Sequence, residues 1–252
     1  MTTRAVRATL ADILPLRLLF LQESNCQIRY DACHARGWSD SYLLQIDEAV
    51  VGYGAVKGQA IPDRDTIFEF FVVPPFRSHT NALFGDLLSA SGASFIECQS
   101  NDASLSPLLA TFAQDISSDV ILFADDHVTE HAIPGALVRP RREEDSPFEH
   151  AVEPVGDYVL ELGGDVVATA GFLLHYNPPF ADLFMEVTPN RRQHGYGTFI
   201  LQEVKKACYL SGRVPAARCD RQNVASKATL LRAGMRICGE MRLGRVTSRP
   251  PL

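Results

Sequence analysis

Tyr42–Val56 reads YLLQIDEAVVGYGAV, and Tyr158–Phe172 reads YVLELGGDVVATAGF. The two stretches match in register, since each has an apolar, β-branched run, a two-residue turn and a second such run. The turns are Asp47-Glu48 and Gly163-Gly164. Runs joined in this way indicate a β-hairpin, most strongly where two glycines form the turn. The sequence therefore predicts the same hairpin twice.

The repeat extends beyond the hairpins. Three further pairs of segments match in the same order: FFVVPP at 70–75 with FMEVTP at 184–189, NDASLSPLL from Asn101 with NVASKATLL from Asn223, and VRATLAD from Val6 with VRPRREED from Val138. Self-similarity at a nearly constant separation indicates repeated structural units. We therefore predict two homologous domains, 1–130 and 136–252, joined within 127–136, where turn residues are frequent and periodicity is weak.

Each domain is expected to run in the order opening strand, helical region, hairpin, strand, helix, strand, helix and final strands. This order predicts an α/β (α+β) fold in which a mixed, mostly antiparallel twisted sheet is flanked by helices. The best-supported helix is Thr198–Leu210, because Phe199, Ile200 and Val204 share one side at helical spacing. Gly212 is a plausible end for it.

Composition and charge limit the class of protein. The 252 residues are 46% hydrophobic and 21% charged, which is typical of a folded soluble chain and excludes collagen, coiled coil or global disorder. Six scattered cysteines with no C-x-x-C pair suit reduced thiols. With no secretory signal and no apolar run of ~20 residues, we expect a cytoplasmic protein without membrane contact.

The charge is unevenly divided between the predicted domains. Residues 1–134 hold 8 basic and 17 acidic residues, whereas 135–252 hold 16 and 13, so the net charge of −6 comes from the first half. The second half could host an anion. Its basic excess is small and has no aromatic-interleaved stripe, which argues against nucleic-acid binding.

The segment RRQHGYG at 191–197 lies between a predicted strand and the predicted helix. Such a loop directs unpaired N–H groups and the positive end of the helix dipole at one point. Gly195 and Gly197 would allow close approach of a ligand, and Arg191 and Arg192 are suited to phosphate oxygens. A tight turn before a surface helix, with solvated arginines, is the structural alternative.

Together with its flanking segments, this half resembles the GNAT superfamily of acetyl-CoA-dependent N-acetyltransferases. The family's [RQ]-x-x-G-x-[GA] loop is matched by 192–197, its V-x-P strand end by 187–189, and its later N-x-x-[AS] segment by Asn223 and Ser226. The resemblance implies that acetyl-CoA is the cosubstrate. No cluster of cysteine, histidine and aspartate has convincing metal-ligand spacing, so we expect no metal. The cofactor-binding residues it implies are Met185, Glu186, Val187, Arg192, Gln193, His194, Gly195, Tyr196, Gly197, Thr198 and Asn223.

The resemblance also implies which groups would do the chemistry. A carboxylate on the V-x-P strand often serves as base, and here Asp182 is the first candidate and Glu186 the second. A solvated carboxylate at the end of a strand is the alternative for Asp182. The family's tyrosine acid, seven residues after the asparagine, is replaced by Leu230, which leaves the acid unassigned. His175, beyond the second hairpin, could border the acceptor site, and a surface histidine at the end of a strand is the favoured alternative.

The first domain keeps the framework without the glycine loop. Aligning Pro75 with Pro189 places Asn81 and Leu83 at the positions of Gly195 and Gly197, and Pro107 falls in the later helix. A Cβ at both loop positions should block a pyrophosphate. We therefore expect a degenerate first domain that does not bind coenzyme A.

The leading hypothesis is an N-acetyltransferase that transfers acetyl directly from acetyl-CoA to a primary amine in the second domain. The acceptor would be a small molecule or a peptide, and the chain a monomer or homodimer. The alternative is a non-catalytic module that senses coenzyme A or binds proteins. In the second domain the acceptor region is compressed to about 141–156, RREEDSPFEHAVEPVG, so the sequence does not identify the amine.

Overall fold

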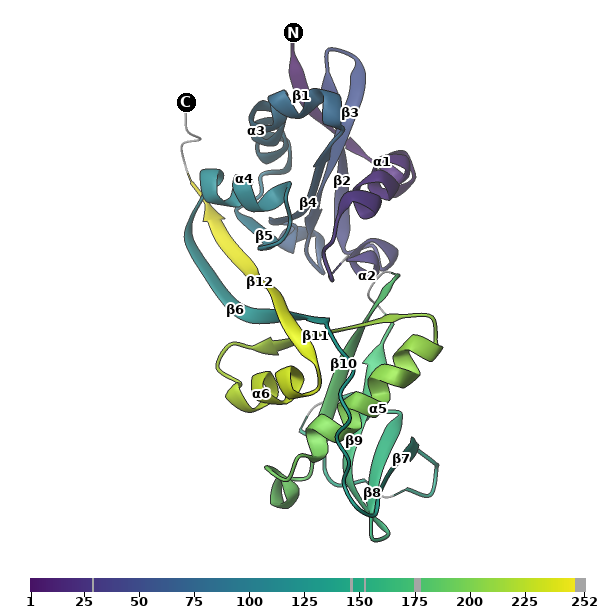
Figure 1. Cartoon of the computed structure of the whole chain (residues 1–252). Helices are drawn as coiled ribbons and strands as arrows, with labels where there is room; N and C mark the ends of the chain where they lie inside the picture. Colours follow the sequence, from purple (N-terminus) through teal and green to yellow (C-terminus); the bar gives the residue numbers. More distant parts are fainter. Residues whose placement is uncertain (29, 146, 152, 175–177, 248–252) are drawn as a thin grey trace. The chain divides into compact units, whose positions relative to one another are not determined.

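The computed structural model describes residues 1–252 except 29, 146, 152, 175–177 and 248–252. The chain divides into two compact units. Unit 1 comprises Met1–Asp119 and Gly239–Leu252, and unit 2 comprises Val120–Cys238. Two long strands, β6 (Ala113–Asp125) and β12 (Met235–Val246), each begin in one unit and end in the other (Figure 1).

Unit 1 is a mixed sheet with helices on both faces. Its elements are β1 (Thr3–Ala8), α1 (Leu10–Glu23), α2 (Asp31–Ala35), β2 (Ser39–Ile46), β3 (Ala49–Lys57), β4 (Thr66–Val72), α3 (Thr80–Ser91), β5 (Phe95–Gln99) and α4 (Leu105–Phe112), with short 3₁₀ turns at Ile61–Asp63 and Pro74–His79. The strand order is β1-β2-β3-β4-β5-β12. Neighbours are antiparallel except β4 and β5, which pair in parallel.

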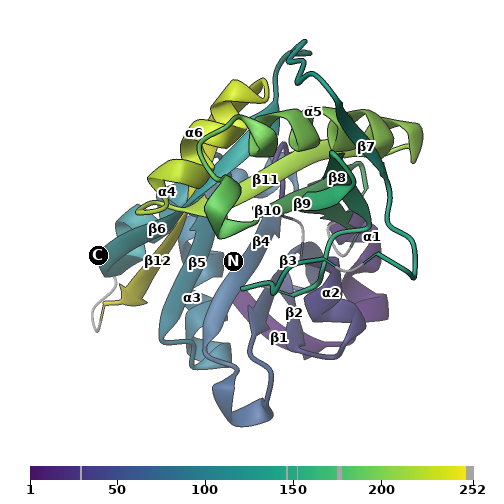
Figure 2. The ribbon, with the colours of Figure 1, turned by 90° about the horizontal axis from the view of Figure 1, so that it is seen from below.

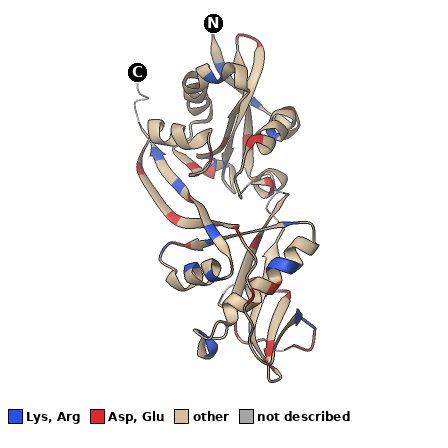
Figure 3. Ribbon diagram, in the orientation of Figure 1, with Lys and Arg blue, Asp and Glu red and all other residues tan. Residues whose placement is uncertain are grey.

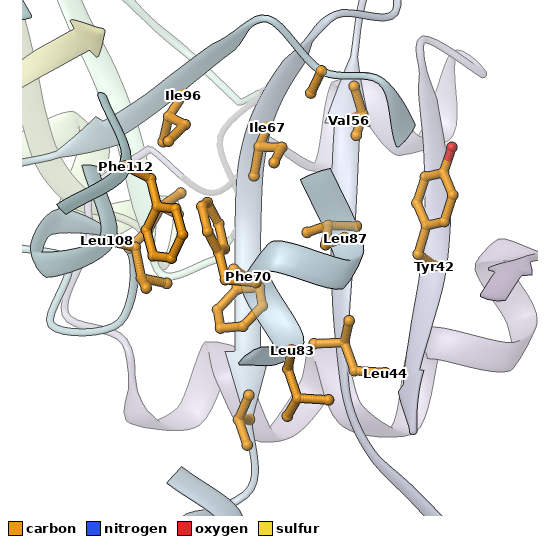
Figure 4. Close-up of a cluster of buried hydrophobic side chains, with 14 of the residues drawn as sticks. Tyr42, Leu44, Val56, Ile67, Phe70, Leu83, Leu87, Ile96, Leu108 and Phe112 are labelled. Carbon is orange, nitrogen blue, oxygen red and sulfur yellow. The ribbon is translucent and has the colours of Figure 1, made fainter. Parts of the chain in front are cut away.

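The main core of unit 1 lies between the sheet and α3. Leu83, Phe84 and Leu87 fall at helical spacing and are fully buried against the strands (Figure 4). The ring of Phe84 packs edge-on against Phe70 of β4, with centroids 5.1 Å apart, and lies 5.0 Å from Phe112 of α4. Burying a side chain of this size stabilises the fold by roughly 1.5–3 kcal/mol.

The described residues of unit 2 form a similar sheet with fewer helices. Its elements are β7 (Ala136–Pro140), β8 (Tyr158–Leu162), β9 (Asp165–Leu173), β10 (Phe180–Val187), a 3₁₀ turn (Pro189–Arg191), α5 (Tyr196–Leu210), β11 (Val214–Asp220) and α6 (Val224–Arg232). The strand order is β6-β11-β10-β9-β8-β7, and β10 pairs with β11 in parallel. Helix α5 lies along β9 and β10 (Figures 1 and 2) and buries Ile200, Leu201 and Val204.

The α+β architecture, both hairpins and the α5 helix match the sequence expectations. The hairpins turn at Asp47-Glu48 and Gly163-Gly164, and α5 starts two residues before the predicted Thr198. Among the residues that the structure describes, a helical region between the opening strand and the hairpin is found in unit 1. In unit 2 the described residues between β7 and β8 contain no helix. Pro147 and Pro154 interrupt this short segment, and a residue before proline is disfavoured in helix.

The backbone registers correct the sequence alignment of the repeats by one residue. Val73 N donates to Val51 O, and Thr188 N donates to Val167 O, so Pro74, not Pro75, is equivalent to Pro189. Two adjacent prolines, Pro74 and Pro75, follow β4, and its pairing with β3 decides which of them is equivalent to Pro189. Because a slip of one residue moves every side chain to the other face, the correction changes which side chains are equivalent.

The two ends of the predicted second domain also behave differently from expectation. The predicted boundary placed all of 136–252 in the second domain, but Gly239–Leu252 clusters with unit 1 because β12 pairs with β5 over Met241–Arg245.

The predicted linker, 127–136, is held against α5. Lys205 Nζ donates to His127 O at 2.9 Å, and Gln202 Oε1 accepts from His131 N at 2.7 Å.

Candidate functional site

The glycine loop at 192–197 has the backbone shape that its sequence predicts. Gln193 and Gly195 have φ values of 66° and 82°, in the left-handed region, and α5 begins at Tyr196. A bulky residue is strained at such angles, and glycine is not. The basic residues of this loop lie just before α5 (Figure 3). The turn therefore places Arg191 and Arg192 beside the start of a 15-residue helix.

The N-terminus of α5 has unused hydrogen-bond donors. No side chain of the described part of the chain caps it, and the first N–H groups of a helix have no carbonyl one turn earlier to bond. Within the described residues, Phe199 N donates to Gly195 O, but no protein acceptor is found for the amide hydrogens of 193–198. These donors and the helix dipole together favour an anion.

The side chains of the loop divide between shaping it and facing solvent. Arg192 is exposed and donates its Nε–H to the carbonyl oxygen of Val187 at 3.2 Å. His194 Nδ1 lies 2.7 Å from Arg192 O, so this nitrogen carries the proton, and the ring stacks on Tyr196 with centroids 5.7 Å apart. Tyr196 and Thr198 are themselves buried. Their side chains therefore pack inside unit 2 and support the loop.

Gly197 brings three predicted segments together. A Cβ at Gly197 would lie 3.1 Å from Thr229 Cγ2 of α6 and 3.3 Å from Met185 Sδ of β10. Both distances are tighter than ordinary van der Waals contact. The start of α5 is therefore packed between β10 and α6, and glycine is what permits this approach.

The strands next to the loop separate. β10 pairs with β11 over Phe180–Asp182 only, whereas its pairing with β9 continues to Val187. In the described structure the other edge of Leu183–Val187 therefore has no strand partner. Of the three residues whose backbone was predicted to line the cosubstrate, Met185 and Val187 direct their backbone groups to this edge, whereas Glu186 pairs with Thr169 of β9. The carbonyl oxygen of Val187 is bonded by Arg192. Unpaired N–H and C=O groups on a strand edge are ready to bond an extended ligand.

Asp182 and Glu186 lie on the face of β10 opposite α5, since alternate residues point to opposite faces. Asp182 is 6% exposed, and its Oδ2 lies 3.4 Å from Nε of Arg218. It is thus a buried, ion-paired carboxylate rather than the solvated one of the structural alternative. Both oxygens of Glu186 lie 3.1 Å from the N–H of Ala151. His175 lies outside the described residues.

The structure adds His150 to this face, a residue that the sequence did not indicate. His150 Nε2 lies 2.7 Å from Oγ1 of Thr169, which is buried on β9. The imidazole stacks on Phe148 with centroids 4.3 Å apart. Thr169 is also the cross-strand partner of Glu186. No periodicity marks a histidine in an irregular segment, so only the tertiary structure reveals this position.

Two residues of α6 have roles that differ from the simplest expectation. The side-chain oxygen of Asn223 accepts from Ser226 N at 3.0 Å and so caps the helix. Asn223 remains exposed, with its amide nitrogen unbonded among the described residues. Leu230, at the position of the family's tyrosine, is 3% exposed in the apolar core. No hydroxyl is therefore present there to protonate a thiolate.

The equivalent loop of unit 1 is built differently. Leu83 is fully buried in the core, so it does not occupy a loop position equivalent to Gly197 as the sequence alignment suggested. α3 begins at Thr80 directly after a 3₁₀ turn, and no glycine lies in the turn. Pro107 lies in the first turn of α4 and does not interrupt it, because proline is tolerated there.

Unit 1 instead contains a buried polar cluster that the sequence did not reveal. Glu69 of β4 is 1% exposed and accepts hydrogen bonds from Arg17 Nη2 at 2.9 Å and Tyr53 OH at 3.0 Å, with His34 Nε2 at 3.1 Å. Burial raises the pKa of Glu69, but the hydrogen bonds and charge of His34 and Arg17 outweigh it and hold the pKa below 4.5. Because α1 and α2 cover this cluster, we read it as structural.

Three further observations concern other classes of site. Unit 1 has a cavity of about 540 Å³ at the start of β4 and β5, lined by residues that include Trp38, Lys57 and Glu97, and no predicted site residue lines it. Among the described residues, no group of histidine, cysteine and carboxylate side chains could hold a metal ion. No described helix is both long and apolar enough to cross a membrane.

Comparison with known proteins gives the family of the second unit. Residues 125–235 match the model of the acetyltransferase (GNAT) family. No curated protein is similar enough to match the chain.

Solved structures resemble the whole chain in fold at low sequence identity. A GNAT-family acetyltransferase from Colwellia psychrerythraea has a TM-score of 0.74 at 12% identity, covering 98% of this chain and 100% of its own. A tandem GNAT protein of the clavulanic acid biosynthesis pathway has 0.58 at 12%, covering 98% and 100%. A GCN5-related N-acetyltransferase from Sphaerobacter thermophilus has 0.55 at 15%, covering 99% and 97%. The chain thus has a tandem GNAT fold and carries an acetyltransferase domain of the GNAT family at residues 125–235.

Proposed function

We propose that unit 2 transfers the acetyl group of acetyl-CoA directly to a primary amine. The observation that carries the proposal is that the uncapped start of α5 lies beside the unpaired edge of β10, next to Met185. One end of this arrangement suits a pyrophosphate, and the other suits an extended amide chain. Coenzyme A has both groups.

The residues present fit this cosubstrate. The N–H groups of 193–198 and the guanidinium of Arg192 would bind the pyrophosphate. The backbone of Met185–Val187 would bond the pantetheine arm, and the free amide nitrogen of Asn223 is the further donor that we assign to it. Gly197 supports the fit, because any larger residue would fill the narrow space between Met185 and Thr229.

Acetyl transfer makes three demands on the site. The acceptor amine must lose a proton before it attacks the thioester carbonyl, that carbonyl must be polarised, and the thiolate must gain a proton. A backbone N–H on the unpaired edge of β10 would polarise the carbonyl oxygen. With Leu230 in the core, we expect a water molecule or another side chain to supply the proton to the thiolate.

The binding half of the proposal is tested by Gly195→Asp with Gly212→Asp as its matched control. Gly195 and Gly212 have φ values of 82° and 76°, an added Cβ at either meets no atom within 4 Å, and they flank opposite ends of α5. We expect Gly195→Asp to weaken acetyl-CoA binding on the order of tenfold or more in calorimetry, about 1.4 kcal/mol per factor of ten. Equal affinities for the two variants would overturn the loop assignment.

A non-catalytic coenzyme A-binding or protein-interaction module is the second candidate. The burial of Leu230 at the position of the family's tyrosine acid favours it. Thiol release measured across a panel of amines separates the two functions. Binding of acetyl-CoA without turnover of any amine would favour the second candidate, and consumption of acetyl-CoA the first.

We further propose that the acceptor is a small-molecule or peptide amine, that the chain acts as a monomer or homodimer, and that it works in the cytoplasm. All six cysteines are free thiols, which supports a reducing compartment. A thermal-shift screen of amines, with and without acetyl-CoA, would identify the acceptor class.

A further inference from the structure

The segment containing His150 is fixed over the strands by two separate contacts. His150 Nε2 lies 2.7 Å from Thr169 Oγ1, and Ala151 N lies 3.1 Å from both oxygens of Glu186. Thr169 and Glu186 are direct partners in the β9–β10 ladder. The ring of Phe148 stacks on one face of the imidazole. His150 is thus bonded to β9 and Ala151 to β10, and these two contacts fix the position of the imidazole.

This position is open in unit 2 and closed in unit 1. The β-ladder registers make Phe71 equivalent to Glu186 and Tyr53 equivalent to Thr169. Phe71 and Tyr53 are at most 1% exposed and pack with Ile13 and Phe20 of α1. In unit 2 the described residues of 141–157 form no helix, and His150 is only half-buried. A ligand could reach the imidazole without displacing a core.

The imidazole is also placed beside the stretch where the thioester would lie. Glu186, the strand partner of Thr169, is the middle residue of the Met185–Val187 edge. His150 Nδ1 has no partner among the described residues, whereas Nε2 is engaged by the Thr169 hydroxyl. The tautomer that donates Nε2–H to Thr169 leaves a lone pair on Nδ1, which is the form a base requires.

We propose that His150 is the general base of unit 2, an inference that rests on the proposed acetyltransferase function. Nδ1 takes a proton from the acceptor ammonium, and the amine lone pair then forms a bond to the thioester carbonyl carbon. The amine nitrogen loses a second proton to water as the C–S bond breaks. The thiolate takes the proton held by His150, which gives the amide, free coenzyme A, one proton in solvent and a neutral imidazole.

The two carboxylates on the same face are less suited to this task. Asp182 is 6% exposed and ion-paired with Arg218, so an acceptor amine would have little access to its oxygens. Both oxygens of Glu186 receive the Ala151 N–H, so Glu186 instead positions the segment that carries His150. Among these three side chains, His150 alone combines partial exposure with a polar atom, Nδ1, that has no hydrogen-bond partner among the described residues.

The test compares His150→Ala with His127→Ala in the full chain. His127 is a matched control, because its exposed ring bonds only Asp126 among the described residues. A general base contributes about 10²–10⁴-fold, so we expect His150→Ala to lower kcat by roughly 100-fold or more and His127→Ala to leave it unchanged. Acetyl-CoA affinity should change by less than about twofold in both. Added imidazole should restore part of the His150→Ala activity.

A second variant, His150→Gln, tests whether a loss of activity comes from misfolding rather than from loss of the base. His150→Gln keeps an amide N–H for Thr169 while removing the base, so it should bind acetyl-CoA normally and remain slow. Wild-type kcat in either variant, or a loss of kcat that imidazole does not restore, would overturn the role of His150. Failure of the proposed function would look different, because the wild-type chain itself would then release no thiol with any amine.

Discussion

Arg192 donates its Nε–H to the carbonyl oxygen of Val187, 3.2 Å away. Arg77 makes the equivalent bond to Val72 in unit 1, at 3.1 Å. Both bonds span five residues and close the turn between a strand end and the next helix. The repeat has therefore kept the arginine that shapes the turn, while the glycines are present in unit 2 alone.

Replacing this arginine should separate the functions of the two turns. Arg192→Gln removes a bond worth about 1 kcal/mol and a cation beside the proposed pyrophosphate site, so we expect acetyl-CoA to bind about tenfold more weakly. Arg77→Gln removes the same bond in unit 1 and should leave this affinity unchanged. Calorimetric titration of both variants measures the effect. A similar loss in both variants would show that unit 1 also binds the cosubstrate.

Gly234 has a structural role that can be measured. A Cβ there would lie 2.2 Å from His127 O, and φ is 83°. We expect Gly234→Ala to lower the free energy of unfolding by about 3 kcal/mol or more, because both the strain and the clash must be relieved. Gly212→Ala, at a similar φ in open space, should cost only about 1 kcal/mol. Urea denaturation that ranks the two variants the other way would contradict this.

The buried Glu69–Arg17 pair should control the stability of unit 1. Glu69→Gln removes the buried charge partner of Arg17 and leaves it the half-exposed Asp31, so we expect a cost of about 3 kcal/mol. Glu23→Gln, in the exposed pair with Arg77, should cost less than about 1 kcal/mol. Denaturant unfolding of both variants provides the comparison, and equal costs would argue against the burial of the first pair.

The same pair predicts a dependence on pH. The pKa of Glu69 lies below its ordinary value of 4.5 in the folded chain, so its contribution is complete above that value. The contribution is lost as the pH falls through the folded pKa. The wild-type free energy of unfolding should therefore decline below about pH 4.5 more steeply than that of Glu69→Gln, as measured by urea denaturation at a series of pH values. Parallel curves would show that Glu69 does not contribute.

The ranking of possible bases can be read from kcat. We expect Asp182→Asn to lower kcat by less than about tenfold, against about 100-fold for His150→Ala, because Asp182 is engaged by Arg218. Steady-state thiol release at saturating acetyl-CoA gives both values. If Asp182→Asn were the slower variant, the strand carboxylate would be the base.

The sequence predicted those elements that depend on residues close together along the chain. The hairpins follow from alternating apolar runs and two-residue turns, and α5 follows from its periodic apolar side. The turn at 192–197 follows from its glycines. The one-residue shift at Pro74 was beyond reach, because Pro74 and Pro75 are adjacent and only the pairing of β4 with β3 shows which of them corresponds to Pro189.

The sequence by itself determined that this chain holds two copies of one fold and that only the second has a glycine loop. Repeats and turn residues are properties of neighbours along the chain. The tertiary structure alone decided that β12 completes unit 1 and that His150 lies over Thr169 and Glu186. Strand pairing and side-chain contact join residues far apart in sequence, and their register is fixed by packing that no local pattern encodes.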